Sequence, residues 1–235
     1  PPWQHDQLFT SRYQWQSNGG YWDYRKAYDG IEGPYRCEIG QWAELRTLAG
    51  GGTSVVGSSG GSCIAGAVRN LDEDSVAHDL EDYELYYSSA NVTNRWGASD
   101  GDNYTQRLDR DDLQACLNHV AEGIEGHVRT EIDHMFDIGM AGEGMGFVHA
   151  TDASIPQLAM MRTQGTTIIW SPRSNLDLYM DTTPADIALT MGVPIALGPD
   201  WTWSGSANPI RELRCAQEYL FSRSAKINDK QLYEM

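Results

Sequence analysis

The sequence has no long apolar run and few basic residues, and these two absences exclude broad classes of protein. No stretch approaches the roughly 20 apolar residues that a membrane-spanning helix needs. The 17 lysine and arginine residues are outnumbered by 33 aspartate and glutamate residues, giving a net charge of −16. Because such a surface repels phosphate backbones and anionic lipids, we expect neither a nucleic acid nor a membrane as partner. The 40% hydrophobic content permits one large globular domain, taken here as residues 1–235.

Paired cysteines are also missing. The four cysteines form no C-x-x-C motif, so a zinc knuckle and a thioredoxin-type motif are excluded; they are Cys37, Cys63, Cys116 and Cys215. We therefore expect isolated buried thiols. The first residues do not resemble a signal peptide, but the chain starts without methionine. The compartment stays open, with a soluble cytoplasmic protein favoured over a secreted or periplasmic one.

Short apolar segments alternate with helical patterns along most of the chain. Strands are predicted at residues 53–56, 83–87, 113–120, 146–150, 166–170 and 193–198. Helices are predicted at residues 41–49, 123–135, 154–162, 184–191 and 208–220. This alternation indicates parallel βαβ units and an α/β fold. Residues 1–36, rich in tryptophan, tyrosine and glycine, are expected to form a long ordered loop that lines a site.

Three side chains that can bind metal or transfer a proton lie at strand ends. His119, His149 and Asp200 each fall at or just after the end of a predicted strand. In a (β/α)₈ barrel the carboxyl ends of the strands converge on one mouth, so residues far apart in sequence meet there. A single histidine is more often a core or capping residue. Three such residues at equivalent positions favour a site.

Glu122 lies three residues after His119, just beyond the strand end. A carboxylate there can take a proton from a metal-bound water and deliver it to a leaving group. The alternative is an acidic residue in the first turn of a helix, where it interacts favourably with the helix dipole. Imidazole and oxygen ligands suit zinc or ferrous iron, and such a metal lowers the pKa of bound water to about 7. The chemistry predicted for this site is hydrolysis.

Four short runs carry a resemblance to a known family. They are HVAEG at 119–123, VHA at 148–150, WSPRSNL at 170–176 and ALGPD at 196–200. Their order and spacing resemble the chlorohydrolase, guanine deaminase and cytosine deaminase branch of the amidohydrolase superfamily. The resemblance is specific over residues 113–216 and weak over 1–36 and 72–112. It implies a (β/α)₈ TIM-type barrel, a divalent metal, with zinc ahead of iron, and a small-molecule substrate.

The resemblance also implies a role for each residue of the site. His119 would be a metal ligand, and Asp200 would contact the metal and activate water. Glu122 would be the proton shuttle, and His149 would polarise the substrate. The substrate pocket would be shaped by the loop after the seventh barrel strand and by an aromatic residue after the eighth, namely Ser171, Arg173, Asn175 and Trp201. Loop ion pairing is the alternative for the arginine, and rim packing is the alternative for the tryptophan.

Two features of the family are missing from this sequence. The His-x-His pair of the first strand, which supplies two metal ligands, occurs nowhere, and the chain stops in the helix after the eighth strand. Pro199 also stands where the family usually has threonine. We therefore expect an incomplete barrel without its first strand and C-terminal segment, and weak metal binding by this chain alone.

Three functions remain open at this point. The leading hypothesis is hydrolysis of a C–N bond, by deamination or amide cleavage, in a small cyclic substrate. The second is a non-catalytic binding or scaffold protein derived from the same barrel without the His-x-His. The third, suggested by 12 tyrosines and 8 tryptophans, is a carbohydrate-active protein, which needs two carboxylates about 5–10 Å apart and no metal. Substrate identity and any homo-oligomer stay undetermined.

Overall fold

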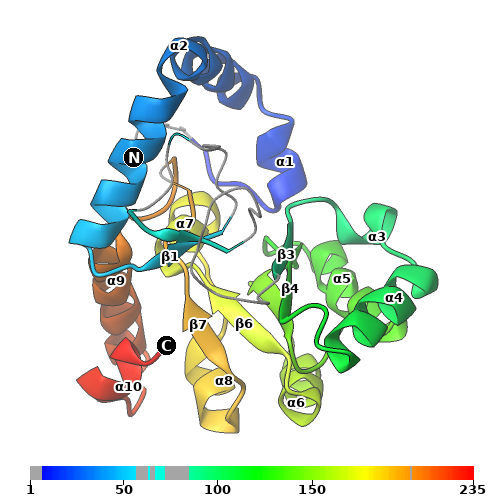
Figure 1. The fold of residues 1–235 in the computed structure, drawn as a ribbon. Coiled ribbons are helices and arrows are strands. Elements are labelled where there is room, and N and C mark those ends of the chain that lie inside the picture. Colours follow the sequence, from blue (N-terminus) through cyan, green and yellow to red (C-terminus); the bar gives the residue numbers. More distant parts are fainter. Residues whose placement is uncertain (1–6, 57–62, 64–66, 72–84, 202) are drawn as a thin grey trace.

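A five-stranded parallel sheet organises the chain (Figure 1). The computed structural model describes residues 7–56, 63, 67–71, 85–201 and 203–235. In spatial order the strands are β3 (Leu85–Ser88), β4 (Ala115–Val120), β5 (Met145–His149), β6 (Thr167–Trp170) and β7 (Ile195–Leu197). Each strand pairs in parallel with the next one along the chain. The predicted α/β class is confirmed, and strands that follow sequence order are the arrangement of a (β/α)₈ barrel. The strands in the described ranges do not close into a barrel.

Helices follow the strands, as parallel connections require. Between β3 and β4 lie α3 (Val92–Arg95) and α4 (Ala98–Asp109), in a polar region without a clear apolar periodicity. After β4 come α5 (Gly126–Asp137), α6 (Ile155–Gln164), α7 (Pro172–Tyr179), α8 (Ala185–Met191), α9 (Pro209–Ser222) and α10 (Asp229–Tyr233). Local signals set several boundaries. Ser154 and Gln157 form a capping box at the start of α6, and Gly165 ends that helix at a φ of 83°.

The core lies where the crossover helices meet the sheet. β5, in the middle of the sheet, is buried at all five positions because helical crossovers cover parallel strands on their faces. Phe147 of β5 packs in one apolar cluster with Met135 of α5 and with Leu158 and Met161 of α6. The apolar runs that predicted the strands are therefore also the residues that hold the sheet and helices together.

The predicted loop over residues 1–36 is wrong in its described part, which is mostly helical. α1 (Arg12–Gln16) is followed by α2 (Gly19–Ala49). The shorter helix predicted at 41–49 is the last part of α2. Glycines and Pro34 inside α2 argue against a helix by propensity, and the backbone at Tyr35 departs from helical angles. Tertiary contacts outweigh propensity here, since Tyr21, Tyr24 and Tyr28 pack around Trp203.

The chain just after the carboxyl end of α2 packs against the start of α9. Gly50 and Gly52 lie against Asn208 and Pro209 at the start of α9, so closely that a Cβ at Gly50 would be 2.4 Å from Asn208 Cβ. The chain continues into β1 (Ser54–Val55), which pairs in parallel with β2 (Arg69–Asn70). Among the described residues, no helix combines the length and apolar character that crossing a membrane requires.

The cysteine prediction was half wrong. Cys37 of α2 and Cys63 form a disulfide, with their Cα atoms 5.6 Å apart. Their wide separation in sequence hid this pairing, because a disulfide requires proximity in space and sequence spacing does not reveal it. Cys116 is a buried free thiol and Cys215 a partly buried one, as expected for isolated thiols.

Candidate metal and proton-transfer site

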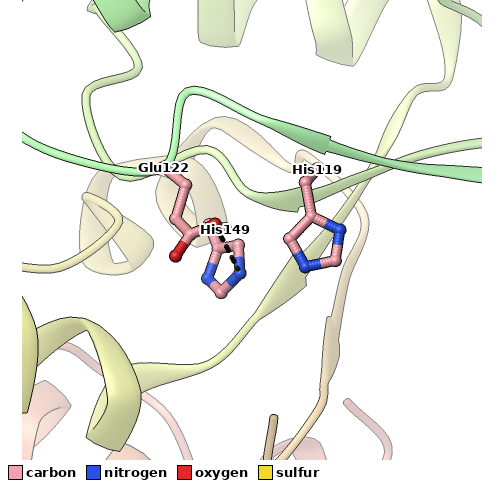
Figure 2. A group of neighbouring side chains, drawn as sticks. All are labelled: His119, Glu122 and His149. Atoms are coloured by element: carbon pink, nitrogen blue, oxygen red, sulfur yellow. Dashed lines mark ion pairs between the residues drawn. The ribbon is translucent and has the colours of Figure 1, made fainter. Parts of the chain in front are cut away.

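His119, Glu122 and His149 converge at the carboxyl edge of the sheet (Figure 2). His119 comes from β4, Glu122 from the turn after it, and His149 from the end of β5. One candidate ligand atom from each residue lies within 4.8 Å of the other two. Donors that share a zinc ion at about 2 Å lie roughly 3–4 Å apart, so only a small contraction would be needed. The donor set of two imidazoles and a carboxylate suits a divalent transition metal.

The ring of His119 is held so that Nε2 is left as its metal-binding atom. Its Nδ1 lies 3.2 Å from the backbone carbonyl oxygen of Ser88 on β3. A carbonyl only accepts hydrogen bonds, so Nδ1 carries the proton and Nε2 keeps its lone pair. Burial, together with the nearby His149 and Arg12, lowers the pKa of His119 to about 3. The imidazole is therefore neutral at physiological pH, which is the form that binds metal.

A buried hydrogen-bond chain fixes the ring of His149 in the same way. Trp170 Nε1 donates to Thr182 Oγ1 at 2.8 Å, and Asn175 Nδ2 donates to the same oxygen at 3.2 Å. The amide oxygen of Asn175 then accepts a hydrogen bond from His149 Nδ1 at 2.9 Å. Nε2 of His149 is left facing the site and lies 3.6 Å from Glu122 Oε2.

The carboxylate of Glu122 is buried and held at both oxygens. Tyr179 donates its hydroxyl proton to Oε1 at 2.9 Å, while Arg12 Nε lies 3.6 Å from Oε2. The direction of the first bond is set by Trp15, whose Nε1 donates to the Tyr179 oxygen at 2.8 Å. Burial alone would raise the pKa of this carboxyl, but His149 and Arg12 outweigh it and lower the pKa to about 2. Glu122 is therefore ionised in this arrangement.

Asp200 lies outside the group of three but within its electrostatic reach. It follows β7, and its Oδ1 accepts a hydrogen bond from the backbone nitrogen of Trp201 at 2.7 Å. Burial raises the pKa of Asp200, and the negative charge of Glu122 raises it further. The structure thus places Asp200 near the predicted partners without bringing its carboxylate among their ligand atoms.

The backbone is unusual where the site residues leave the sheet. Ala121, His149, Ala150 and Asp200 all have a positive φ, between 48° and 75°. Residues other than glycine adopt this conformation at a cost of about 1–3 kcal/mol, and such strain clusters at functional sites. The Ala121 turn is held by Glu131 of α5, whose Oε2 accepts the Ala121 N–H at 2.8 Å.

Three of the predicted substrate-binding residues lie at the start of a helix, which corrects their placement on a loop. Ser171 is the buried N-cap residue of α7, and Arg173 and Asn175 lie in its first two turns. Pro172 at the first helical position is the local signal that the sequence reading missed. Arg173 is exposed, with Nε donating to Ser206 Oγ at 3.1 Å and its backbone nitrogen donating to Glu212.

Trp201 is half-buried and packs with other aromatic side chains. It stacks on Trp203, with ring centroids 4.6 Å apart, and its Nε1 donates to Ser204 Oγ at 3.0 Å. Beneath it lies the aromatic cluster, made of Phe9, Trp15, Tyr21, Leu178, Tyr179 and Trp203. This cluster joins α1, α2 and α7, and it reaches Glu122 through Tyr179, which accepts a hydrogen bond from Trp15 and donates one to Glu122.

Sequence reasoning missed three residues that contact the site. Arg12, Tyr179 and Glu131 are buried beside Glu122 or the turn that carries it. None of these three residues lies in the runs that carry the family resemblance. Tyr179 is the last residue of α7, the helix that begins within the run at 170–176. No local pattern in the sequence distinguishes Arg12 from the other charged residues of the opening segment.

Comparison with known proteins supports the fold. No protein-family model matches the sequence. Over 105 residues the chain is 30% identical to a 5-methylthioadenosine/S-adenosylhomocysteine deaminase of Teredinibacter turnerae. That match covers 43% of this chain and only 24% of the relative. The matched part is thus about a quarter of the whole relative.

Three solved structures share the architecture at low sequence identity. An adenosine deaminase from Xanthomonas campestris with bound zinc has a TM-score of 0.59 at 15% identity, covering 78% of this chain and 50% of its own. A guanine deaminase from C. acetobutylicum with bound guanine has a TM-score of 0.55 at 11% identity, covering 92% of this chain and 63% of its own. A variant of atrazine chlorohydrolase from Arthrobacter aurescens, complexed with zinc and atraton, has a TM-score of 0.55 at 13% identity. The match covers 94% of this chain and 62% of its own. The chain therefore shares the α/β fold of these deaminases and this chlorohydrolase, as the resemblance in its sequence implied.

Proposed function

We propose that this chain carries the metal-binding and proton-transfer part of a zinc-dependent hydrolase that cleaves a C–N bond in a small cyclic substrate. The convergence of His119, Glu122 and His149 at one edge of the sheet carries the proposal. Both imidazoles are held through Nδ1, so that Nε2 of each ring faces the site, where it can bind a metal or contact the substrate. Two deaminases of similar fold, one of them with zinc bound, support C–N cleavage, and a zinc-bound chlorohydrolase of similar fold supports hydrolysis in general.

His119 would hold the metal with Nε2, and Asp200 would contact it from the end of β7. When bound, a divalent metal supplies a hydroxide-like nucleophile near neutral pH. Glu122 is the group on this chain that accepts and returns the proton, since its Oε2 is free of Tyr179 and lies beside His149. His149 would steady the negative charge that develops on the substrate through a proton carried on Nε2, the ring nitrogen that Asn175 leaves facing the site.

The substrate would lie between this edge and the aromatic cluster. A flat heterocycle suits the half-buried ring of Trp201, which presents an aromatic surface next to Asp200. Ser171 and Arg173 remain candidates for substrate contact. Asn175 is better described as a positioning residue, because both ends of its amide are used by His149 and Thr182.

The proposal is tested by turnover of zinc-loaded protein. Aminated heterocycles and cyclic amides are incubated with the chain, and ammonia release and ring opening are measured with and without a chelator. Chelator-sensitive turnover of any substrate supports hydrolysis. If zinc-loaded, folded protein turns over none of them, the non-catalytic binding protein becomes the better description. That second function has one observation in its favour, because Arg12 already neutralises Glu122 without a metal.

Removal of the Asn175 amide should weaken the site while leaving the fold intact. Asn175→Leu takes away the acceptor that fixes His149, so we expect zinc affinity or turnover to fall by about 10–100-fold, as for other partners of metal-binding histidines. Asn175→Asp keeps an oxygen for His149 and should lose less. Zinc titration and initial rates for the two variants check this, and equal losses would contradict a role through the His149 ring.

A further inference from the structure

One buried side chain near the site has no part in the function proposed so far. Arg12, the first residue of α1, is 4% exposed. One of its terminal nitrogens, Nη2, donates to the backbone carbonyl of Ser89, while Nη1 is buried and has no hydrogen-bond partner. Its Nε lies 3.6 Å from Glu122 Oε2. A buried guanidinium with an unpartnered nitrogen is costly unless its charge is used.

The charge of Arg12 is directed at the oxygen where the candidate ligands meet. Glu122 Oε2 is 3.6 Å from Arg12 Nε and also 3.6 Å from His149 Nε2. The Arg12 guanidinium is permanently charged and directs that charge at Glu122 Oε2, so a divalent cation entering the same space would meet a buried positive charge in a medium of low polarity.

Arg12 is fixed in place by its backbone as well as by its side chain. Its N–H donates to the carbonyl of Glu122 at 3.0 Å, and Ser11 forms a β-bridge with Gly123. Gly123 has a φ of 142°, and a Cβ there would lie 2.5 Å from Thr10 O, so only glycine allows this close approach. The segment that carries Arg12 is thus attached to the same turn that carries Glu122.

We propose that Arg12 is the resident counter-cation of Glu122 and sets how tightly this site holds a divalent metal, by competing with it for the Glu122 carboxylate. This inference rests on the metal site of the proposed function and extends it to a residue outside the predicted ligand set. Its consequence is that removing the positive charge at position 12 strengthens metal binding, although it removes a buried side chain that packs against the site.

The test measures zinc affinity by competition with a chromophoric chelator, on the full chain. Arg12→Gln and Arg12→Met remove the charge, and the glutamine can still donate to the Ser89 carbonyl. We expect both to bind zinc at least about tenfold more tightly than the unaltered protein, the ratio that a 1.4 kcal/mol relief of repulsion gives. Arg12→Lys keeps the charge and should stay close to the unaltered protein.

Controls separate this effect from general electrostatics and from misfolding. Arg129→Gln removes an exposed arginine that pairs with Asp152 away from the site, and it should leave zinc affinity unchanged. Circular dichroism and thermal melting check that each variant is folded, and either neutral variant suffices. Unchanged or weaker zinc binding in folded neutral variants overturns the proposal, including the case in which none of the proteins binds zinc. Turnover plays no part in this readout, so a failure of the hydrolase proposal leaves the result decisive.

Discussion

Glu122→Gln is expected to lower the turnover number of the zinc-loaded protein by about 10²–10⁴-fold, the usual contribution of a positioned acid or base. Glutamine keeps the shape of the side chain, and its amide oxygen can still accept the hydrogen bond from the Tyr179 hydroxyl. It cannot carry a proton between water and leaving group. The comparison is made by initial rates at saturating substrate, with zinc content measured on the same samples so that loss of metal is not mistaken for loss of proton transfer.

Glu143→Gln serves as the matched control for this substitution. Glu143 is exposed and lies in the turn before β5, so the same change of charge there should leave turnover within a factor of about two, as is usual for surface substitutions. If Glu122→Gln retained most of the turnover while holding zinc, Glu122 would not be the proton-transfer group. Its buried contacts with Tyr179 and Arg12 would then serve the fold alone.

His119→Ala is expected to reduce bound zinc to background. His119 is a neutral, oriented imidazole with one free nitrogen, and the site has few other ligand atoms, so losing this one removes a large share of the coordination. Metal content by plasma mass spectrometry, after dialysis against a fixed free zinc concentration, gives the result directly. Turnover should fall with the metal.

His127→Ala is the control for the histidine substitution. His127 lies on α5, and its side chain is 54% exposed, so its removal should leave the bound zinc unchanged. Equal zinc in His119→Ala and the unaltered protein would mean that the metal binds elsewhere on the chain. The roles given to His149 and Asp200 would then lose their support as well.

The sheet was predictable because its signal is local. Apolar runs near 113–120, 146–150 and 166–170 were each long enough to read as a strand, and each lies within one to three residues of the observed boundaries. α2 was not predictable in this way. Its glycines and Pro34 weigh against a helix, and what stabilises it is packing of Tyr21 and its neighbours against Trp203, a contact between distant parts of the chain.

The same distinction applies to the site. The rule that strand ends converge predicted that His119 and His149 would meet, and their ring centroids are 5.0 Å apart. Their chemical roles stay predictions. Arg12 and Tyr179 could not be found by that rule, because neither follows a strand and each reaches Glu122 only through the docking of a helix on the sheet edge. Asp200 follows a strand as predicted, yet its carboxylate lies outside the group of three ligand atoms.

The disulfide of α2 bears on how any metal measurement on this protein must be read. Once reduced, Cys37 and Cys63 would become two neighbouring thiols, and thiolates are strong zinc ligands. A sample made or stored under reducing conditions could then carry a second equivalent of zinc, unrelated to His119. Stoichiometry is therefore meaningful only when free thiols are counted alongside the metal. With the disulfide intact, only the buried Cys116 and the partly buried Cys215 should remain unpaired.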